Sequence, residues 1–386
     1  MKNTVILFLL LATSVFANGT RIPSQDANVV ARGYANVASS DAPSSIYYNP
    51  AGLSNLTEQE LQLNVYTLTT NYKHAGEEAG ATFVVPAFFV GVPVHERITL
   101  GWGVYYPYGL ETDWSKNSSF STLATKNSVE YQTIAIAASV KLTETLKLGV
   151  AFEESTNKTE LNQNLFPGPG AGMRVKGEDD SPSFTVGLQW SPSDKHHFGI
   201  SYHSKTDFDL KGTTYVEPLN TTTTNKFKWE YPEHVSVGYS YRPTRKWNFE
   251  LNYEWTNWER LNSVTVESAG LPNTTLPFNW KSSSYTSFGT TYYVTDAWSV
   301  SGGVSYSTNS IPDASYNPAI PDMNKYFFNT GTSYKTKNFT FSLALEVSPT
   351  ETRTITGQTP NFFGESANGK YTSNMWSISS GVSYRF

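Results

Sequence analysis

The sequence predicts an all-β protein, a 14-stranded antiparallel transmembrane β-barrel with an N-terminal plug, or hatch, inside the lumen. Segments that alternate apolar and polar residues recur along the chain, and short connections alternate with long ones. Aromatic residues make up 15% of the chain and charged residues only 16%, whereas soluble domains carry about 25% charge. This composition is typical of a barrel in an outer membrane.

Residues 1–17 are predicted to be a signal peptide. Lys2 precedes the apolar run 5–11, and Val15-Phe16-Ala17 offers a cleavage site before Asn18. The run is too short to span a bilayer, and no later run approaches the roughly 18 apolar residues that a membrane helix needs. The mature chain is therefore expected to be exported and to cross its membrane with strands.

The strands are predicted from two-residue periodicity. In "KWNFELNYEWTNW" the residues Trp247, Phe249, Leu251, Tyr253 and Trp255 share one face and polar residues share the other. Equivalent patterns predict the barrel domain, residues 61–386, with strands near 61–70, 82–90, 98–107, 129–141, 146–155, 183–191, 197–208, 233–241, 247–257, 283–294, 298–307, 326–335, 339–347 and 374–386.

The connections support an even number of strands. Short turns at 95–97, 142–145, 191–196, 242–246, 295–297 and 335–337 alternate with long connections near 71–81, 108–128, 156–182, 209–232, 258–282, 308–325 and 348–373. Short periplasmic turns and long extracellular loops are typical of bacterial barrels. With the N-terminus on the periplasmic side, every short turn falls on that side.

Tryptophans are expected to form two interfacial belts, since their rings favour the headgroup level. Trp190, Trp247 and Trp298 lie beside short turns, while another four lie at the ends of long loops, namely Trp229, Trp258, Trp280 and Trp376. The chain ends at Phe386, and an aromatic C-terminus resembles the signal by which the barrel-assembly machinery recognises its clients.

About forty residues are left between the signal peptide and the first strand. This segment, assigned to 18–60, is too apolar for a disordered tail and too short for a periplasmic domain. A barrel of fourteen strands is too wide for side chains alone to fill. The segment is therefore predicted to fold inside the lumen as a plug.

Four motifs give the chain a resemblance to a known family. They are "ARGYANVASSDAPSSIYYNPAGLSNL", "GWGVYYPYGLETDW", "YPEHVSVGYSYRPTRKWNFELNYEWTNWERL" and "IPDASYNPAIPDMNKYFFNTGTSYK". In this order they resemble the FadL-type outer-membrane transporters of long-chain fatty acids and hydrocarbons, also called OmpP1/FadL/TodX-like proteins. The resemblance covers essentially the whole mature chain.

The resemblance implies passive transport of hydrophobic molecules in the bacterial outer membrane. Outer loops would capture fatty acids, alkanes or aromatics, a lumenal pocket would hold them, and a kink in the third strand would release them laterally. The partners would be these molecules, the outer-membrane lipid and the assembly machinery.

Three groups of candidate site residues follow. Asn49, Pro50 and Ala51 are a hatch turn at the ligand path or, alternatively, an ordinary turn. Gly101, Gly103 and Pro107 mark the kink of the third strand or, alternatively, a place where small residues admit the hatch. The apolar residues of the 156–182 loop form a capture groove with the 209–232 loop or merely pack that loop onto the rim; they are Leu161, Leu165, Phe166 and Met173.

A carboxylate substrate would need a cation, and the predicted lumen face offers none. That face carries glutamates instead, at 153, 250, 254 and 346, while the candidates Arg174, Lys176 and Lys205 read more simply as solvated surface residues. The pattern favours an uncharged apolar substrate over a fatty acid.

Other functions find little support in the sequence. There is no cysteine, the six histidines lack metal-ligand spacing, and no nucleophile motif stands out, so no catalytic residue, metal site or cofactor is predicted. The net charge of -5 without a basic block disfavours nucleic acid. The alternatives are a general or structural porin and, less favoured, a barrel that hydrolyses lipids.

Overall fold

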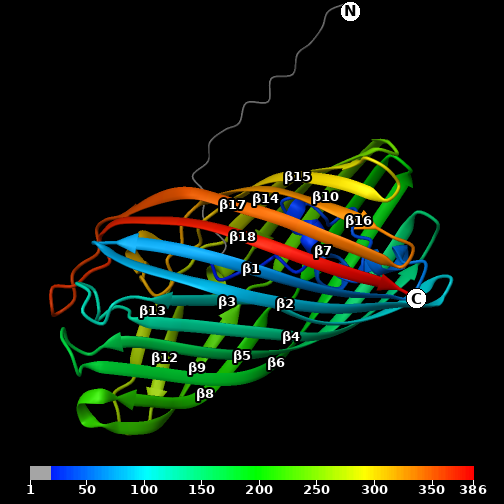
Figure 1. Cartoon of the computed structure of the whole chain (residues 1–386). Coiled ribbons are helices and arrows are strands. Elements are labelled where there is room, and N and C mark those ends of the chain that lie inside the picture. The colour runs from blue at the N-terminus through cyan, green and yellow to red at the C-terminus, as the bar shows by residue number, and fades with distance from the viewer. Residues whose placement is uncertain (1–18) are drawn as a thin grey trace, which may run out of the picture.

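The computed structural model describes residues 19–386, so the predicted signal peptide lies outside the described residues. Within this range, fourteen antiparallel strands close into a barrel (Figure 1). The fourteen-stranded prediction is confirmed. In the order of their pairing the strands are β1 (Glu60–His74), β2 (Glu77–His95), β3 (Ile98–Asp113), β4 (Lys126–Lys141), β5 (Leu146–Asn164), β6 (Gly172–Ser193), β7 (His196–His203), β10 (His234–Thr244), β11 (Trp247–Thr256), β14 (Ser283–Tyr293), β15 (Trp298–Ser307), β16 (Lys325–Lys335), β17 (Phe339–Ile355) and β18 (Gly369–Arg385), which pairs with β1.

The long connections are more regular than the sequence suggested. Several barrel strands continue into these connections. Four further strands extend the barrel wall at the long-loop end, namely β8 (Thr206–Val216), β9 (Thr221–Tyr231), β12 (Ser263–Ser268) and β13 (Thr274–Pro277). The predicted strand 197–208 is wrong at its end, because β7 stops at His203 and β8 begins at Thr206. Strands β8 and β9 keep the two-residue alternation, with apolar residues such as Phe208 and Trp229 buried on the inner face. Their outer face carries charged residues such as Asp209 and Lys228, whereas a lipid-facing strand is apolar there.

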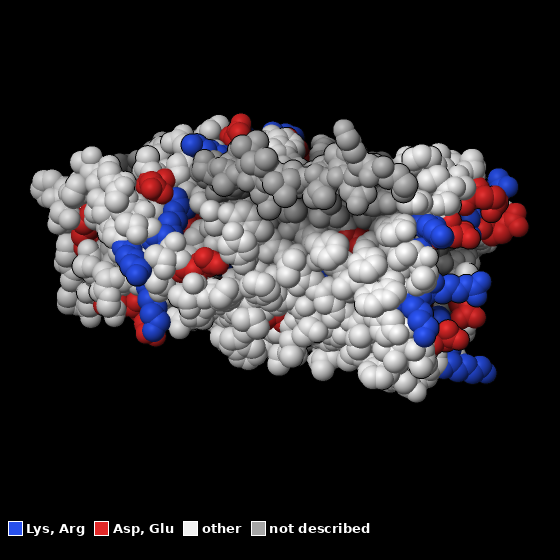
Figure 2. Space-filling model, turned by 90° about the horizontal axis from the view of Figure 1, so that it is seen from above, with Lys and Arg blue, Asp and Glu red and all other residues white. Residues whose placement is uncertain are grey.

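On the face seen in Figure 2, charged residues gather towards the two ends of the barrel and the part between them is largely uncharged. Trp190, Trp247, Trp298 and Trp376 are exposed on the outer face of the barrel, as a belt requires. The interpretation of Trp229, Trp258 and Trp280 as belt residues is wrong, since these three are buried in the interior. The connections that hold them fold into the mouth of the barrel, where the rings find a dry core. No helix in residues 19–386 is long and apolar enough to cross a membrane.

Residues 19–59 lie inside the barrel and form three short helical turns (Figure 1). They are α1 (Ala27–Ala31), α2 (Ser45–Tyr48) and the 3-10 turn η1 (Pro50–Asn55). The Asp26 side chain caps α1 by accepting a hydrogen bond from the Asn28 amide, and Asn49 caps η1 in the same way. Local capping forms the plug turns, because helices this short cannot support themselves.

The inner wall makes room for the plug with glycines. A Cβ atom added to Gly149, Gly199 or Gly303 would collide with the plug backbone at Pro50, Val37 or Arg32. Other wall glycines meet plug side chains, for example Gly101, where a Cβ would lie 2.9 Å from the Ile46 and Leu53 side chains. The small residues seen on the polar face of the strands are therefore a fitted seat for the plug.

This seat yields a first testable prediction. Gly303→Val is expected to lower the free energy of unfolding by about 1–3 kcal/mol, the usual cost of overpacking. The neighbouring Gly302→Val is a matched control, because a Cβ there would meet only the Asn329 carbonyl oxygen, at 3.8 Å. Urea unfolding in detergent micelles measures the free energy of unfolding of both variants. An equal decrease in the two variants would contradict the close fit between Gly303 and the plug.

Candidate transport path: groove, cavity and wall gap

An apolar groove of about 450 Å³ opens at the long-loop end of the barrel. Its walls come from four connections: the β5–β6 hairpin, the β8–β9 hairpin, the 264–278 segment and the 314–320 segment, which includes part of the 3-10 turn η4 (Asp313–Ser315). Its volume lies within the range of about 300–1,000 Å³ that small-molecule sites occupy. The groove therefore has the size and lining of a site for an apolar molecule.

Three of the four predicted capture residues line this groove. Leu161, Leu165 and Met173 belong to its wall, whereas Phe166 is 41% exposed and is not among the lining residues. The contribution of the 264–278 and 314–320 segments was missed, because their apolar residues have no regular spacing. Their best signal was the apolar content of "LPNTTLPF" in a loop that would otherwise face water.

The groove holds no charge. None of its lining residues in the described chain is Asp, Glu, Lys, Arg or His. The three cations considered from sequence lie elsewhere: Lys176 pairs with Glu160 at 2.8 Å, Lys205 pairs with Asp207 at 2.6 Å, and Arg174 stacks on Tyr215. An anionic head group would find no partner in this groove.

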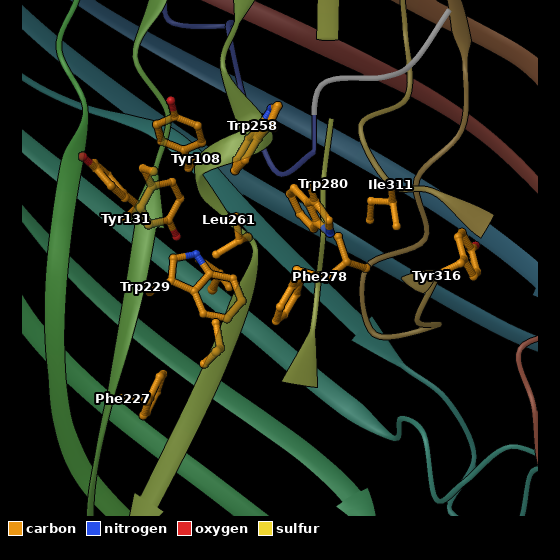
Figure 3. Close-up of a cluster of buried hydrophobic side chains, with 14 of the residues drawn as sticks. Tyr108, Tyr131, Phe227, Trp229, Trp258, Leu261, Phe278, Trp280, Ile311 and Tyr316 are labelled. Carbon is orange, nitrogen blue, oxygen red and sulfur yellow. The ribbon is translucent and has the colours of Figure 1, made fainter. Parts of the chain in front are cut away.

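An aromatic core lies beneath the groove and closes the mouth of the barrel. Figure 3 shows Tyr108 from β3, Tyr131 from β4 and Trp229 from β9 converging with Trp258 and Trp280. Trp258 belongs to the 3-10 turn η3 (Trp258–Arg260), and its ring centroid lies 4.8 Å from that of Trp280. Phe278 and Tyr316 belong both to this core and to the groove lining, so the groove and the core are continuous.

A second cavity of about 130 Å³ lies inside the barrel, above the plug. It is lined by plug residues 19–24, by the upper halves of β1, β2 and β3, and by residues 320–325. The expectation that the lumen lacks a buried cation is wrong, because Arg21 of the plug lines this cavity and forms an ion pair with Glu254. The alternation of the strands shows only the residues of the wall, whereas the cation that pairs with this glutamate comes from the plug.

Two buried carboxylates, Glu346 and Asp322, line the cavity and form hydrogen bonds there. Glu346 accepts hydrogen bonds from Tyr34 of the plug, from Tyr66 at 2.9 Å and from Asn329 at 2.8 Å. In the 308–324 connection, Asp322 accepts hydrogen bonds from the Ser310 amide at 2.7 Å and its hydroxyl at 3.0 Å. Burial raises the pKa of the Asp322 carboxyl, and the hydrogen bond from the Ser310 amide opposes this shift. These bonds fix the connection as a wall of the cavity.

The barrel wall has a gap between β2 and β3. Their ladder runs only from His95↔Ile98 to Phe88↔Val104, although β2 begins at Glu77 and β3 continues to Asp113. Beyond Val104, β3 contains a bulge between Tyr105 and Tyr108. Phe83 of β2 and Leu110 of β3, one from each side of this gap, both line the inner cavity.

Of the three predicted kink residues, only Pro107 lies at this gap, because Gly101 and Gly103 are paired with Gly91 and Phe89 in the intact ladder. Pro107 is within the bulge, where it lacks a ladder donor. Gly101 lies below and meets the plug, while a Cβ on Gly103 would lie 2.6 Å from the Phe89 ring. The sequence reading missed Pro86, which sits on β2 two residues past the last paired position; a proline inside a predicted strand was the available signal.

Asn49, Pro50 and Ala51 pack against the wall near the short-turn end. The side-chain amide of Asn49 donates to the Val37 carbonyl at 2.8 Å and to the Leu188 carbonyl of β6 at 3.2 Å. Pro50 and Ala51 face Gly149 of β5. None of the three lines the groove or the inner cavity, so the structure does not bring this turn together with the other candidate residues.

Comparisons with known proteins agree with this architecture. The family model for outer membrane protein transport proteins (OMPP1/FadL/TodX) matches residues 8–386. The 47 kDa outer membrane protein of Pasteurella multocida is 21% identical, with 84% of this chain and 86% of the relative covered, and the long-chain fatty acid transport protein of Salmonella typhi is 18% identical at the same coverage.

Solved structures show the same fold. A FadL homologue of Pseudomonas aeruginosa superimposes with a TM-score of 0.89 at 20% identity, covering 96% of this chain and all of the homologue. The toluene transporter TodX of Pseudomonas putida gives a TM-score of 0.72 at 18% identity, covering 96% and 99%. The chain therefore belongs to the family of outer-membrane transport proteins (OMPP1/FadL/TodX) and is a β-barrel of the outer membrane.

Proposed function

We propose that this protein lets small hydrophobic molecules cross the outer membrane passively, by way of the groove, the inner cavity and the gap between β2 and β3. The observation that carries the proposal is the position of the cavity, whose lining includes the unpaired halves of both strands. A molecule that leaves there enters the bilayer without crossing the plug.

Capture is the first step. The groove is lined mostly by aliphatic and aromatic side chains, with uncharged polar ones among them. An apolar molecule gains free energy when it leaves water for the apolar part of such a surface, at about 25 cal/mol per Å² buried. No cofactor or energy source is needed for this step, since the free energy of transfer drives it.

Lateral release is the second step. Leu68, Phe83 and Leu110 line the inner cavity beside the gap, so the apolar lining leads toward the lipid. The plug fills the axial route below with buried polar residues, and an apolar molecule would lose free energy on that route. The lateral route is therefore the more favourable one.

The substrate is best described as an uncharged hydrocarbon. Named relatives transport long-chain fatty acids and toluene, but the groove here offers no cation. Two cations line the inner cavity: Arg21 is already paired with Glu254, and Lys325 lies over the Tyr72 ring. Displacing a buried partner from an ion pair is costly. A carboxylate would thus bind more weakly than an alkane or an aromatic ring of similar size.

A charge placed in the groove tests capture. Met173→Glu is expected to weaken binding of a radiolabelled alkane by about tenfold or more, because a carboxylate in an apolar site is either poorly solvated or brings water with it. Thr222→Glu adds the same charge to the β8–β9 hairpin at an exposed residue that does not line the groove, and should leave binding unchanged. Equal affinities of both variants would contradict the capture site.

A general porin is the main alternative. It would admit small sugars at a high rate, whereas the plugged barrel should not, because residues 19–59 occupy the lumen. Swelling of liposomes that contain the purified protein distinguishes the two functions. Rapid swelling in a sugar such as arabinose would overturn the proposed function.

A further inference from the structure

The edge of β3 that β2 leaves unpaired is not empty. Inside the barrel the N-terminal segment lies along it: the Ile22 amide donates to the Pro107 carbonyl at 2.8 Å, and the Gly109 amide donates to the Thr20 carbonyl at 2.9 Å. Arg21 and Tyr108 form an antiparallel bridge between these two bonds. A short stretch of plug is thus bonded to β3 as a neighbouring strand would be.

Gln25 completes this pairing with its side chain. It is fully buried, its amide nitrogen donates to the Tyr106 carbonyl at 2.8 Å, and its amide oxygen accepts from the Tyr106 amide at 3.3 Å. The side-chain amide therefore acts as a peptide group toward β3, two residues past the end of the β2–β3 ladder at Val104. The same nitrogen also donates to the Ile22 carbonyl at 2.8 Å, which ties it to the segment.

The segment is anchored away from β2. Arg21 is ion-paired with Glu254 of β11 and donates to the Tyr47 hydroxyl at 3.2 Å. The Tyr48 hydroxyl donates to the Pro23 carbonyl at 2.7 Å and accepts a hydrogen bond from the backbone amide of Gln25 at 3.0 Å. These contacts belong to the plug and to a distant strand, so they hold the upper half of β3 toward the lumen and apart from β2.

We propose that residues Thr20 to Gln25 are a substitute strand that occupies the β3 edge in place of β2 and so keeps the wall gap formed, with Gln25 as its positioning residue. The peptide groups of Tyr106, Pro107 and Gly109 need partners inside the barrel. When the substitute strand is lost, β2 is the neighbour that can supply them. The proposal rests on the proposed function only for what passes through the gap.

The competing arrangement has a defined register. If the ladder continued upward from Phe88↔Val104 while β3 kept its one-residue bulge, Phe83 would lie opposite Leu110, and both residues line the inner cavity. Cα atoms of such a pair are about 4.5–5.5 Å apart, so cysteines there can form a disulfide. Because the chain has no cysteine of its own, a double variant Phe83→Cys with Leu110→Cys reports this state alone.

The experiment measures disulfide yield in the full-length protein in lipid vesicles under mild oxidation. Adding Gln25→Leu, which removes both hydrogen bonds to Tyr106, should raise the yield by more than tenfold, since each lost bond shifts an equilibrium by roughly fivefold. Adding Ile22→Pro, which removes the donor to Pro107, should raise it further. Asn28→Ala changes a nearby plug amide whose side chain is not bonded to β3 in the described chain, and should have no effect.

A second cysteine pair keeps the result interpretable. Val92 and Leu100 face each other in the intact part of the ladder, so Val92→Cys with Leu100→Cys should crosslink in every folded background. If Gln25→Leu reduces this control yield, Gln25→Glu, which keeps the side-chain size but loses the donor, is used under the same criteria. An unchanged low yield for Phe83–Leu110, or a high yield already in the parent chain, would overturn the substitute strand.

Uptake of a labelled alkane by the same variants separates the two proposals. If β2 pairs with the upper half of β3 and uptake is lost, both the substitute strand and lateral release are supported. Re-pairing with normal uptake would leave the substitute strand in place and contradict lateral release, whereas lost uptake without re-pairing would contradict the substitute strand alone.

Discussion

Deleting Pro107 is expected to reduce alkane uptake to the rate of cells that lack the protein. In the bulge of β3, two residues oppose one residue of β4, and removing one of them restores a regular ladder. β3 can then run beside β2 and close the gap. Uptake of a radiolabelled alkane by cells that express the variant measures the effect.

A matched control is available between β6 and β7, away from the gap. The ladder between β6 and β7 has a similar irregularity at 191–192, between Trp190 and Ser193, and Pro192 can be deleted there. This deletion should leave uptake near that of the parent chain. If loss of Pro107 leaves uptake intact while the variant is folded, the lateral route is wrong.

Removing Asn18 to Ser54 is expected to leave a folded barrel that admits small sugars. The ring of fourteen strands is closed without the plug, and a barrel of this width has a lumen too large for its own side chains to fill. Sugar permeation in liposomes should rise on the order of tenfold or more, since wider barrels with open lumens conduct water-soluble molecules.

The opposite outcome has a clear meaning. The plug supplies Arg21 to Glu254 and the Ala38 amide to Glu250, the latter at 2.8 Å. If the truncated chain fails to insert, these buried glutamates need the plug to fold, and the segment is structural rather than a barrier. Electrophoretic assay of the folded form before and after heating distinguishes the two cases.

Much of the barrel could be predicted from the sequence, because lipid on one side and a polar lumen on the other force a two-residue alternation. The pattern in β11, with Leu251 and Tyr253 facing outward, is its plainest example. Above the membrane the outer face of the wall is charged, as at Lys226 and Lys228 of β9, and β8, β9, β12 and β13 were expected as loops because they lack an apolar outer face. Periodicity reports the solvent on each face, and there both faces lack lipid.

The path was harder to predict, because it depends on contacts between distant segments. Pro107 could be found as a breaker in a strand, but its role as acceptor for Ile22 depends on a contact across 85 positions of sequence. Arg21 was missed as a lumenal cation for the same reason, and Trp258 was taken for a belt residue. A single sequence shows which residues are unusual, and the fold decides which of them meet.

Photolabelling tests the central claim, lateral release between β2 and β3, most directly. The purified protein in vesicles would be loaded with an alkyl diazirine, illuminated and digested, and the labelled residues identified by mass spectrometry. The account predicts labels in the groove at Leu161 and Met173, in the cavity at Phe83 and Leu110, and on Val84, which is 65% exposed on β2 at the gap. Labels that instead continue to the periplasmic mouth, at Glu58 and Thr295, would contradict it.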